Sequence, residues 1–423
     1  MPRVPSLRHR ATTMVAATVL TTAPVVLAAP AAAADLPYSD QCAFPNGKYP
    51  GRPWSLQRVL LDELWSQSTG KGMRVAVIDT GVDVTNPQLT EAVDVKSGRN
   101  FLPKDLKDDD GNPIERGKEN GTTDTVGHGT KVAGIIAARP AKGTGFVGLA
   151  PDATIIPIQQ NDAEGNGDVG TLTAAIHHAV QAGADVINIS QDTTKPMTST
   201  SRLKLAIDQA LNKGIVVVAS AGNDGLGGNV KETYPAAYEG VLAVAASDRN
   251  NERASFSQSG EFVGVAAPGV DMISTVPKGG HCSDSGTSFS APYVAGLAAL
   301  IKAKHPDWTA RQIVAQIEQT AERTTAGHDR LVGWGVVDPV RALTQDEHPV
   351  ESPDPRADLG RAEAPTPAEF RIGETAEERD ARLATYVTVG SAVLVAGMGG
   401  TAVAIRDARR RQRRRPEDGP WTR

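Results

Sequence analysis

The sequence is poor in cysteine. It contains two, Cys42 and Cys282, and neither belongs to a CxxC motif, which excludes the common cysteine-based zinc and redox motifs. Excess charge is also lacking, since 44 basic and 49 acidic residues leave a formal net charge of −5, which argues against nucleic acid as a partner. No internal repeat of solenoid length is present. With 40% apolar residues, the 423-residue chain has the composition of a globular domain with tails.

The first 34 residues have the pattern of an export signal. Three arginines precede an apolar stretch at residues 14–29, and a run of small residues ends at Ala34, where we expect signal peptidase to cleave. An uncleaved anchor is the alternative. The segment has no Arg-Arg pair, so it does not indicate the twin-arginine route. In an exported protein Cys42 and Cys282 are expected to pair, whereas in a reducing compartment they would be two separate thiols.

The C-terminal part contains a second apolar stretch, residues 386–405, with no charged side chain. Twenty residues in a helix rise about 30 Å, which is enough to cross the hydrocarbon core of a bilayer. The arginine-rich segment 406–423 that follows is typical of the cytoplasmic side. We therefore expect a single-pass protein of the cell membrane, with its main domain outside the cell and a short tail inside. A buried core helix is the alternative.

Two connecting segments flank the main domain. Residues 35–72 contain apolar residues at helical spacing, in the tract RPWSLQRVLLDELW, and predict an extension packed on the domain. Residues 344–385 are rich in proline, acidic residues and alanine, which predicts a flexible linker to the membrane.

The main domain, residues 73–343, alternates two patterns. Short apolar, β-branched runs such as RVAVID and IVVVAS are separated by helical stretches such as LTAAIHHAVQAG. This alternation predicts an α/β fold, with a mainly parallel sheet and helices on both faces. Ligands in such folds bind outside the carboxyl ends of the strands. Polar residues that follow a strand are therefore the first candidates for chemistry.

A hydrophilic loop at residues 101–124 contains Asp108, Asp109 and Asp110. Three adjacent carboxylates suit calcium, but their spacing fits no EF-hand, and we favour a solvated surface loop as their interpretation. The sequence therefore indicates no defined metal site, and we expect no cofactor.

Three short motifs place reactive side chains at the ends of predicted elements. VAVIDTGVD puts Asp79 directly after a buried strand, GHGTKVAGIIAA puts His128 at the start of a helix, and SGTSFSAPYVAGL puts Ser288 at the start of another. Each residue alone suits a cap or a turn. Together they supply a nucleophile, a general base and a carboxylate that orients the base, and their order Asp, His, Ser is one known order of a catalytic triad.

A fourth motif, VVVASAGNDG, puts Asn223 in a glycine-rich turn just after a strand. Its side-chain amide is suited to donate to the oxyanion of a tetrahedral intermediate, with the backbone N–H of Ser288 as the second donor. A turn asparagine is the interpretation that applies if the other three residues do not converge.

The motifs DTGVD, GHGT, SAGN and GTSFSAP, in this order, resemble the subtilisin-like protease family. The resemblance covers about residues 72–343 and implies a three-layer α/β fold and a serine endopeptidase that acts on polypeptides. The signal peptide, N-terminal extension, Pro-rich linker, C-terminal span and basic tail resemble the mycosin group, which implies a link to a type VII secretion membrane complex.

One segment departs from the family pattern. Many subtilases have Ser-Leu-Gly along the substrate cleft, whereas here Ser190 is followed by Gln191 and Asp192. We expect Ser190 and Asp192 to contact substrate, with Asp192 narrowing the specificity pocket or favouring particular side chains. This predicts selective processing of exported proteins rather than general digestion. A structural component of a secretion complex, with proteolysis secondary, is the competing hypothesis. If Cys42 pairs with Cys282, the extension is pinned near the active site as a permanent part of the protein.

Overall fold

The computed structural model describes residues 42–105, 107, 111, 116–162, 167–194, 201–228, 231–323, 325–355 and 376–413. The chain divides into two compact units at Asp358. The predicted signal peptide, residues 1–34, and the candidate calcium residues Asp108, Asp109 and Asp110 lie outside the described residues.

A seven-stranded sheet forms the centre of the first unit, with strand order β2-β3-β1-β4-β5-β6-β7 and every neighbouring pair parallel. A separate antiparallel pair, β8 and β9, lies outside this sheet. The strands are β1 (Arg74–Asp79), β2 (Arg99–Asn100), β3 (Thr154–Gln159), β4 (Val186–Ile189), β5 (Val216–Ser220), β6 (Leu242–Ser247), β7 (Val263–Pro268), β8 (Met272–Thr275) and β9 (His281–Asp284).

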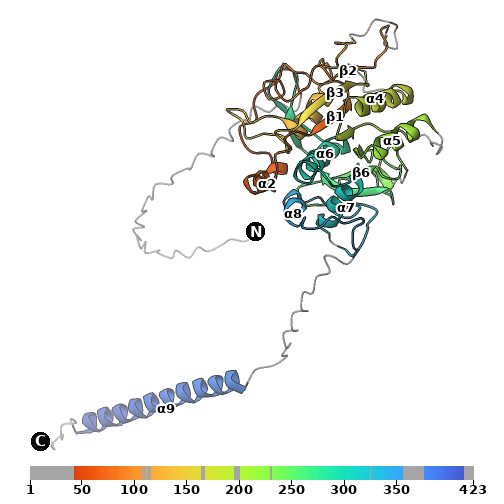
Figure 1. Cartoon of the computed structure of the whole chain (residues 1–423). Coiled ribbons are helices and arrows are strands. Elements are labelled where there is room, and N and C mark those ends of the chain that lie inside the picture. The colour runs from red at the N-terminus through yellow and green to blue at the C-terminus, as the bar shows by residue number, and fades with distance from the viewer. Residues whose placement is uncertain are drawn as a thin grey trace, which may run out of the picture. The chain divides into compact units, whose positions relative to one another are not determined.

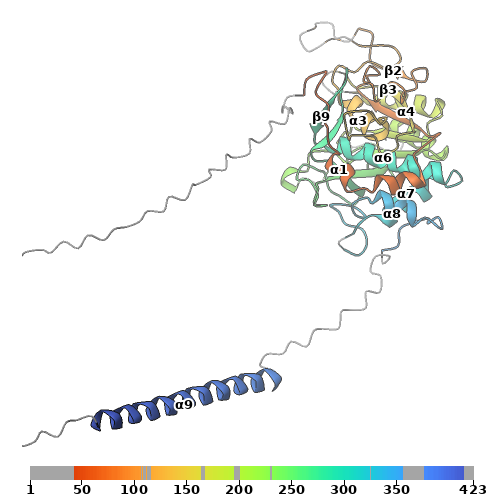
Figure 2. The ribbon, with the colours of Figure 1, turned by 90° about the vertical axis from the view of Figure 1, so that its left-hand side faces the viewer.

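Helices cover both faces of the sheet, as Figures 1 and 2 show. Successive side chains of a strand point to opposite faces, so Val75 and Val77 of β1 join one core cluster, while Ala76 and Ile78 join the other. The helices of this unit are α1 (Trp54–Gln57), α2 (Leu61–Gln67), α3 (His128–Ala137), α4 (Val169–Gln181), α5 (Arg202–Asn212), the 3₁₀ turn η1 (Leu226–Gly228), α6 (Thr287–Lys304), α7 (Ala310–Thr320) and α8 (Pro339–Thr344).

The two faces carry different helices. The first cluster contains α3, α6 and α7, and the second contains α4 and α5. Helix α6 is buried from Thr287 to Ile301, because it packs on the sheet and has α3, α7 and α8 around it. The predicted three-layer α/β fold is confirmed.

The described part of the N-terminal extension, residues 42–72, packs on the domain. Leu56, Leu61 and Leu64 are buried in the first core cluster. The indole N–H of Trp65 donates to the carbonyl of Leu149 at 3.0 Å, and that of Trp54 donates to the carbonyl of Val270 at 3.0 Å. Both bonds join the extension to distant parts of the chain, so this segment shares the core of the domain.

The contacts of the domain continue beyond the predicted boundary at Leu343. Asp346 forms ion pairs with Lys304 at 2.6 Å and with His305 at 2.5 Å. Further along, the side chain of Gln312 donates to Glu351 at 2.7 Å. The sequence places the start of a flexible linker at residue 344. The structure instead has residues 344–355 in contact with the domain, because polar side chains of this proline-rich segment find partners on α6 and α7.

The second unit contains helix α9 (Ala376–Gln412), which begins ten residues before the predicted span starts at Tyr386. Of the helices that the structure describes, this is the one long and apolar enough to cross a membrane, with a mean hydropathy of 1.7 in its most apolar window. Hydroxyl groups within it bond to their own helix, as Thr388 does to the carbonyl of Ala384 at 2.7 Å. Such internal bonds satisfy polar groups in a lipid environment.

Candidate active site

Asp79 and His128 meet at the carboxyl end of β1. Asp79 is the last residue of the strand and is 1% exposed, and His128 is the first residue of α3. The Nδ1 atom of His128 lies 2.7 Å from Oδ1 of Asp79. A carboxylate can only accept, so this contact assigns the ring proton to Nδ1 and leaves Nε2 unprotonated in the neutral imidazole.

The electrostatic surroundings favour protonation of His128. Burial opposes the charged imidazolium, but the charge of Asp79 and its hydrogen bond outweigh burial, and Asp124 and Asp284 add to them. The pKa of His128 is therefore raised above its usual value of 6.5. A histidine whose pKa is raised in this way readily accepts a proton from a neighbouring group.

A second buried carboxylate, Asp124, holds the turn that carries His128. It accepts hydrogen bonds from the backbone N–H of Gly127 at 2.7 Å and from both the backbone and the hydroxyl of Thr130, at 2.9 and 2.6 Å. The hydroxyl of Thr80, next to Asp79, donates to it at 3.0 Å. Asp124 was not among the site residues predicted from the sequence. An aspartate four residues before the histidine, in DTVGHGT, was the available signal.

Ser288 lies at the N-terminus of α6 and is 9% exposed. Its hydroxyl donates to the backbone carbonyl of Ser190 at 3.1 Å, and none of the hydrogen bonds between described residues joins it to His128. The ring of the next residue, Phe289, lies 5.1 Å from the ring of His128, so the imidazole sits beside this end of the helix. Hydrogen bonds at catalytic groups are often incomplete without substrate.

Asn223 lies just past β5 and faces the start of α6. Its side-chain Oδ1 accepts from the backbone N–H of Thr287 at 2.9 Å and from the Thr287 hydroxyl at 3.0 Å. The same hydroxyl accepts from the backbone N–H of Gly222 at 3.2 Å. These bonds fix the amide oxygen, and the Nδ2 group lies by Gly286, since a Cβ atom built on that glycine would be 3.6 Å from it. Thr287 thus holds the side chain of Asn223 in place; it was not predicted from the sequence, although it stands within the GTS motif.

The predicted substrate residues Ser190 and Asp192 lie on the loop after β4. The hydroxyl of Ser190 accepts from the side-chain amide of Asn188 at 2.8 Å. Asp192 lies against Gly222, since a Cβ atom built on that glycine would be 2.8 Å from Oδ2 of Asp192. Asp192 is exposed at the surface, but it is partly removed from solvent. This partial burial and the charge of Asp224 raise the pKa of Asp192 to about 6.

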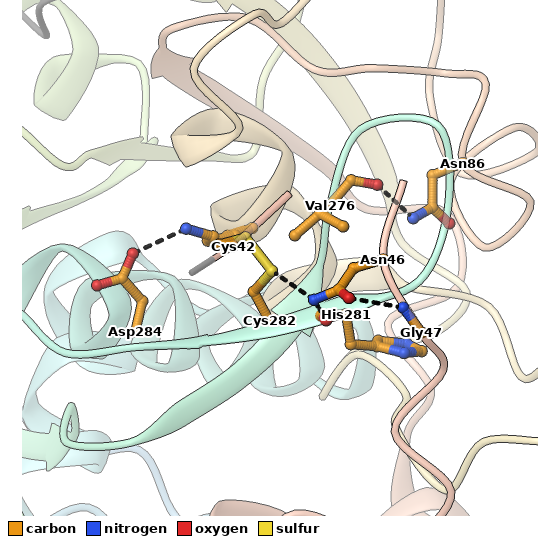
Figure 3. The surroundings of a disulfide bond; sticks show 9 residues. Cys42, Asn46, Gly47, Asn86, Val276, His281, Cys282 and Asp284 are labelled. Atoms are coloured by element: carbon orange, nitrogen blue, oxygen red, sulfur yellow. Dashed lines mark hydrogen bonds and ion pairs between the residues drawn. A yellow bond between two sulfur atoms is a disulfide. The ribbon is translucent and has the colours of Figure 1, made fainter. Parts of the chain in front are cut away.

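The two cysteines form a disulfide bond, which resolves the alternatives that the sequence left open. Figure 3 shows Cys42 joined to Cys282 of β9, with the side chain of Asn46 beside the pair. The Nδ2 group of Asn46 lies 3.0 Å from the carbonyl of His281, and the Asn46 N–H donates to the carbonyl of Gly279 at 3.0 Å. The extension is therefore tied to the segment that precedes Ser288.

The pinned segment also reaches the turn that precedes the histidine. A side chain on Gly127, which has a φ of +84°, would run into the ring of Phe44. Close by, Lys131 of α3 forms an ion pair with Asp284 of β9 at 2.8 Å. The disulfide, the Phe44 contact and this ion pair together hold the extension, α3 and β9 as one assembly around the site.

The described residues offer no metal centre beside this site. Nowhere in the described ranges do three His, Cys, Asp or Glu side chains gather closely enough to hold a metal ion.

Comparisons of this chain with protein-family patterns, curated proteins and solved structures agree with one another. Residues 70–335 match the subtilase family, peptidase group S8. Subtilisin E of Bacillus subtilis (strain 168) is 38% identical over 295 residues, which cover 69% of this chain and 71% of that protein. The crystal structure of MycP1 with its N-terminal propeptide removed is 35% identical, with a TM-score of 0.60, and the match covers 70% of this chain and 98% of that one. The structure of MycP3 protease from the type VII (ESX-3) secretion system is 34% identical, with a TM-score of 0.61, and covers 71% of this chain and 90% of its own.

Proposed function

Because the chain belongs to the subtilase family of serine endopeptidases, we propose that Asp79, His128 and Ser288 form its catalytic triad. The observation that carries this proposal is the 2.7 Å hydrogen bond between Asp79 and His128, beside the end of α6 that carries Ser288. That bond leaves Nε2 of His128 as the free base of the imidazole.

In the proposed reaction, Nε2 of His128 takes the hydroxyl proton as Oγ of Ser288 bonds to the substrate carbonyl carbon. Asp79 keeps the Nδ1 proton and stabilises the imidazolium. The tetrahedral intermediate then breaks its C–N bond, and His128 returns the proton to the leaving amine. A water molecule then attacks the carbonyl carbon of the acyl-enzyme in the same way, with His128 as the base, and frees Ser288. The positive end of the α6 dipole favours the negative charge that develops on the oxyanion.

We expect replacement of Asn223 by alanine to lower kcat by about 100- to 1000-fold with little change in KM, because an oxyanion donor acts mainly in the transition state. Steady-state kinetics on a fluorogenic peptide measures both constants. Thr287→Val, which keeps the shape but loses the hydroxyl bond to Asn223, should lower kcat by a smaller factor. Thr287→Ser, which keeps the hydroxyl, is the matched control and should stay near wild type. A rise in KM at constant kcat in Asn223→Ala would contradict this role.

The proposed biological setting concerns where the protease is located and what it cleaves. We propose that α9 anchors the protease in the cell membrane, with the domain outside and the arginine-rich tail inside, and that it processes exported proteins selectively. The apolar length of α9 supports the anchor. The structural similarity to a protease from a type VII secretion system supports a place beside such a complex. The close contact between Asp192 and Gly222 supports a selective cleft.

Deletion of the gene, followed by complementation, tests this proposal in cells that naturally produce the protein. If proteolysis is the essential contribution, wild type restores the secretion of type VII substrates, and Ser288→Ala at equal membrane abundance fails as the deletion does. The readout is the secreted proteome with the processing state of each protein. If Ser288→Ala restores secretion fully, the competing hypothesis of a structural component is correct. The attachment of the extension to the domain through the disulfide bond between Cys42 and Cys282 is the observation that favours this second candidate.

A further inference from the structure

We propose that the last turns of α9 bind anionic phospholipids of the membrane through four arginine side chains that share one face of the helix. These residues form the arginine face: Arg406, Arg409, Arg410 and Arg413. This inference rests on the proposed anchoring of the protease by α9.

Helix α9 does not end where its apolar stretch ends. It continues past Ile405 to Gln412, and Figures 1 and 2 show it as one unbroken, straight helix. The backbone N–H of Arg413 still donates to the carbonyl of Arg409 at 3.3 Å. A helix rises about 1.5 Å per residue, so the segment from Arg406 to Arg413 extends about 10 Å beyond the apolar stretch. The headgroup layer of one leaflet is roughly 5 to 8 Å thick, so this segment is long enough to cross it.

The four arginines form one strip because of their spacing. Residues three or four apart are neighbours on the surface of a helix, and each member of the arginine face has another at one of these distances. Together with Ala402 and Ile405, their side chains line one hollow on the surface of α9. Asp407 and Arg411 do not line it, and they pair with each other at 2.9 Å.

The positive charge of the arginine face is exposed and unbalanced. Within the residues that the structure describes, no ion pair joins any of these four side chains to a carboxylate, since the nearby Asp407 is taken by Arg411. A guanidinium keeps its charge at any physiological pH, and its planar fork donates two parallel hydrogen bonds to a phosphate. Four such groups on one strip are therefore suited to bind phosphate oxygens.

The order of groups along the hollow favours a phospholipid over a soluble anion. Ala402 and Ile405 supply apolar surface on the side of the membrane core, and the arginines follow. A phospholipid has the same order, with acyl chains in the core and a phosphate at the surface, whereas a soluble phosphate would use the arginines alone. In the proposed topology this end of α9 lies at the cytoplasmic leaflet, whose anionic lipids attract basic segments next to a span.

The test uses the full mature chain in a neutral detergent, with phosphatidylglycerol or phosphatidylcholine that carries a fluorescent acyl chain as the probe. We expect phosphatidylglycerol, whose headgroup is anionic, to bind about 10-fold more tightly than zwitterionic phosphatidylcholine when Kd is measured by fluorescence anisotropy. Replacement of the four arginines by glutamine should abolish this preference and leave the Kd for phosphatidylcholine within about twofold of wild type.

Two variants that keep the net charge separate the arginine face from the total charge of the tail. The exchange Ala408→Arg with Arg409→Ala moves one arginine away from the hollow, which Ala408 does not line, and should lower the preference by about two- to threefold. The control, Asp407→Asn with Arg411→Gln, removes the ion pair outside the hollow and should keep the wild-type preference.

Retention in vesicles of phosphatidylcholine alone separates failure of this inference from failure of the proposed anchor. The chain should resist extraction from them by alkaline carbonate, because the apolar stretch of α9 is sufficient to hold it. A retained chain without a preference for phosphatidylglycerol, or with a preference that survives the loss of all four arginines, overturns the inference and leaves the anchor standing. Displacement of labelled phosphatidylglycerol by millimolar inorganic phosphate would assign the arginines to a soluble anion and also overturns it. A chain that carbonate extracts overturns both the anchor and the inference.

Discussion

Replacement of Ser288 by alanine is expected to lower kcat by about 10⁴- to 10⁶-fold, the loss typical of a serine protease without its nucleophile. The covalent route disappears, because alanine has no oxygen to bond to the substrate carbonyl. The fold should persist, since the one side-chain hydrogen bond described for Ser288 is to the carbonyl of Ser190, and it lies at the end of a helix that is buried from Thr287 to Ile301.

Two measurements check this result on the ectodomain with its disulfide intact. Peptide hydrolysis gives the kinetic loss, and a fluorophosphonate probe followed by peptide mapping identifies the labelled residue. Wild type should be labelled at Ser288 and the variant not at all, with equal thermal stability. Ser290→Ala, two residues further along α6, is the control and should keep both activity and labelling. Equal labelling of wild type and Ser288→Ala would place the nucleophile elsewhere.

The change Asp79→Asn is expected to lower kcat by about 10⁴-fold while the fold is kept. An asparagine at this position can present its N–H₂ group to His128, which would place the imidazole proton on Nε2 and remove the base that faces Ser288. Asp124 would still hold the turn through Gly127 and Thr130, so the loss arises from the tautomer and the charge rather than from a displaced histidine.

The pH profile separates this explanation from a loss of folding. Catalysis needs neutral His128, whose pKa in the wild type is raised by Asp79 against the effect of burial. Wild-type kcat/KM should therefore rise with pH through an inflection above 6.5. In Asp79→Asn the carboxylate charge is lost and burial remains, so the pKa of His128 falls and the residual activity should persist to lower pH.

The profile is measured as kcat/KM against pH for wild type, Asp79→Asn and the control Glu239→Gln, which removes an exposed carboxylate far along the chain. The control should keep the wild-type inflection. An inflection that stays in place in Asp79→Asn would show that Asp79 does not set the pKa of His128, and the proposed role of this aspartate would be wrong.

Local patterns in the sequence were sufficient for the fold. Runs such as RVAVID and IVVVAS are apolar at consecutive interior positions, because a parallel strand covered by helices on both faces has no side exposed to solvent. The helical stretches predicted between these runs, including the one that begins at His128, coincide with helices of the structure. The motifs around Asp79, His128, Asn223 and Ser288 were visible for the same reason, since each combines a strand or helix end with its own glycines.

Only the tertiary structure decided how distant residues meet. The pairing of Cys42 with Cys282 joins positions 240 residues apart, and the sequence left it open. The contacts by which Asp124 holds the histidine turn, Thr287 orients Asn223 and Asp192 lies against Gly222 were likewise not predicted from the sequence. The predicted start of the linker at residue 344 came before the contacts of Asp346 and Glu351 with the domain. Periodicity reports which side of a local element is buried, whereas these contacts depend on which loops the parallel sheet brings to one edge, and no local pattern records that.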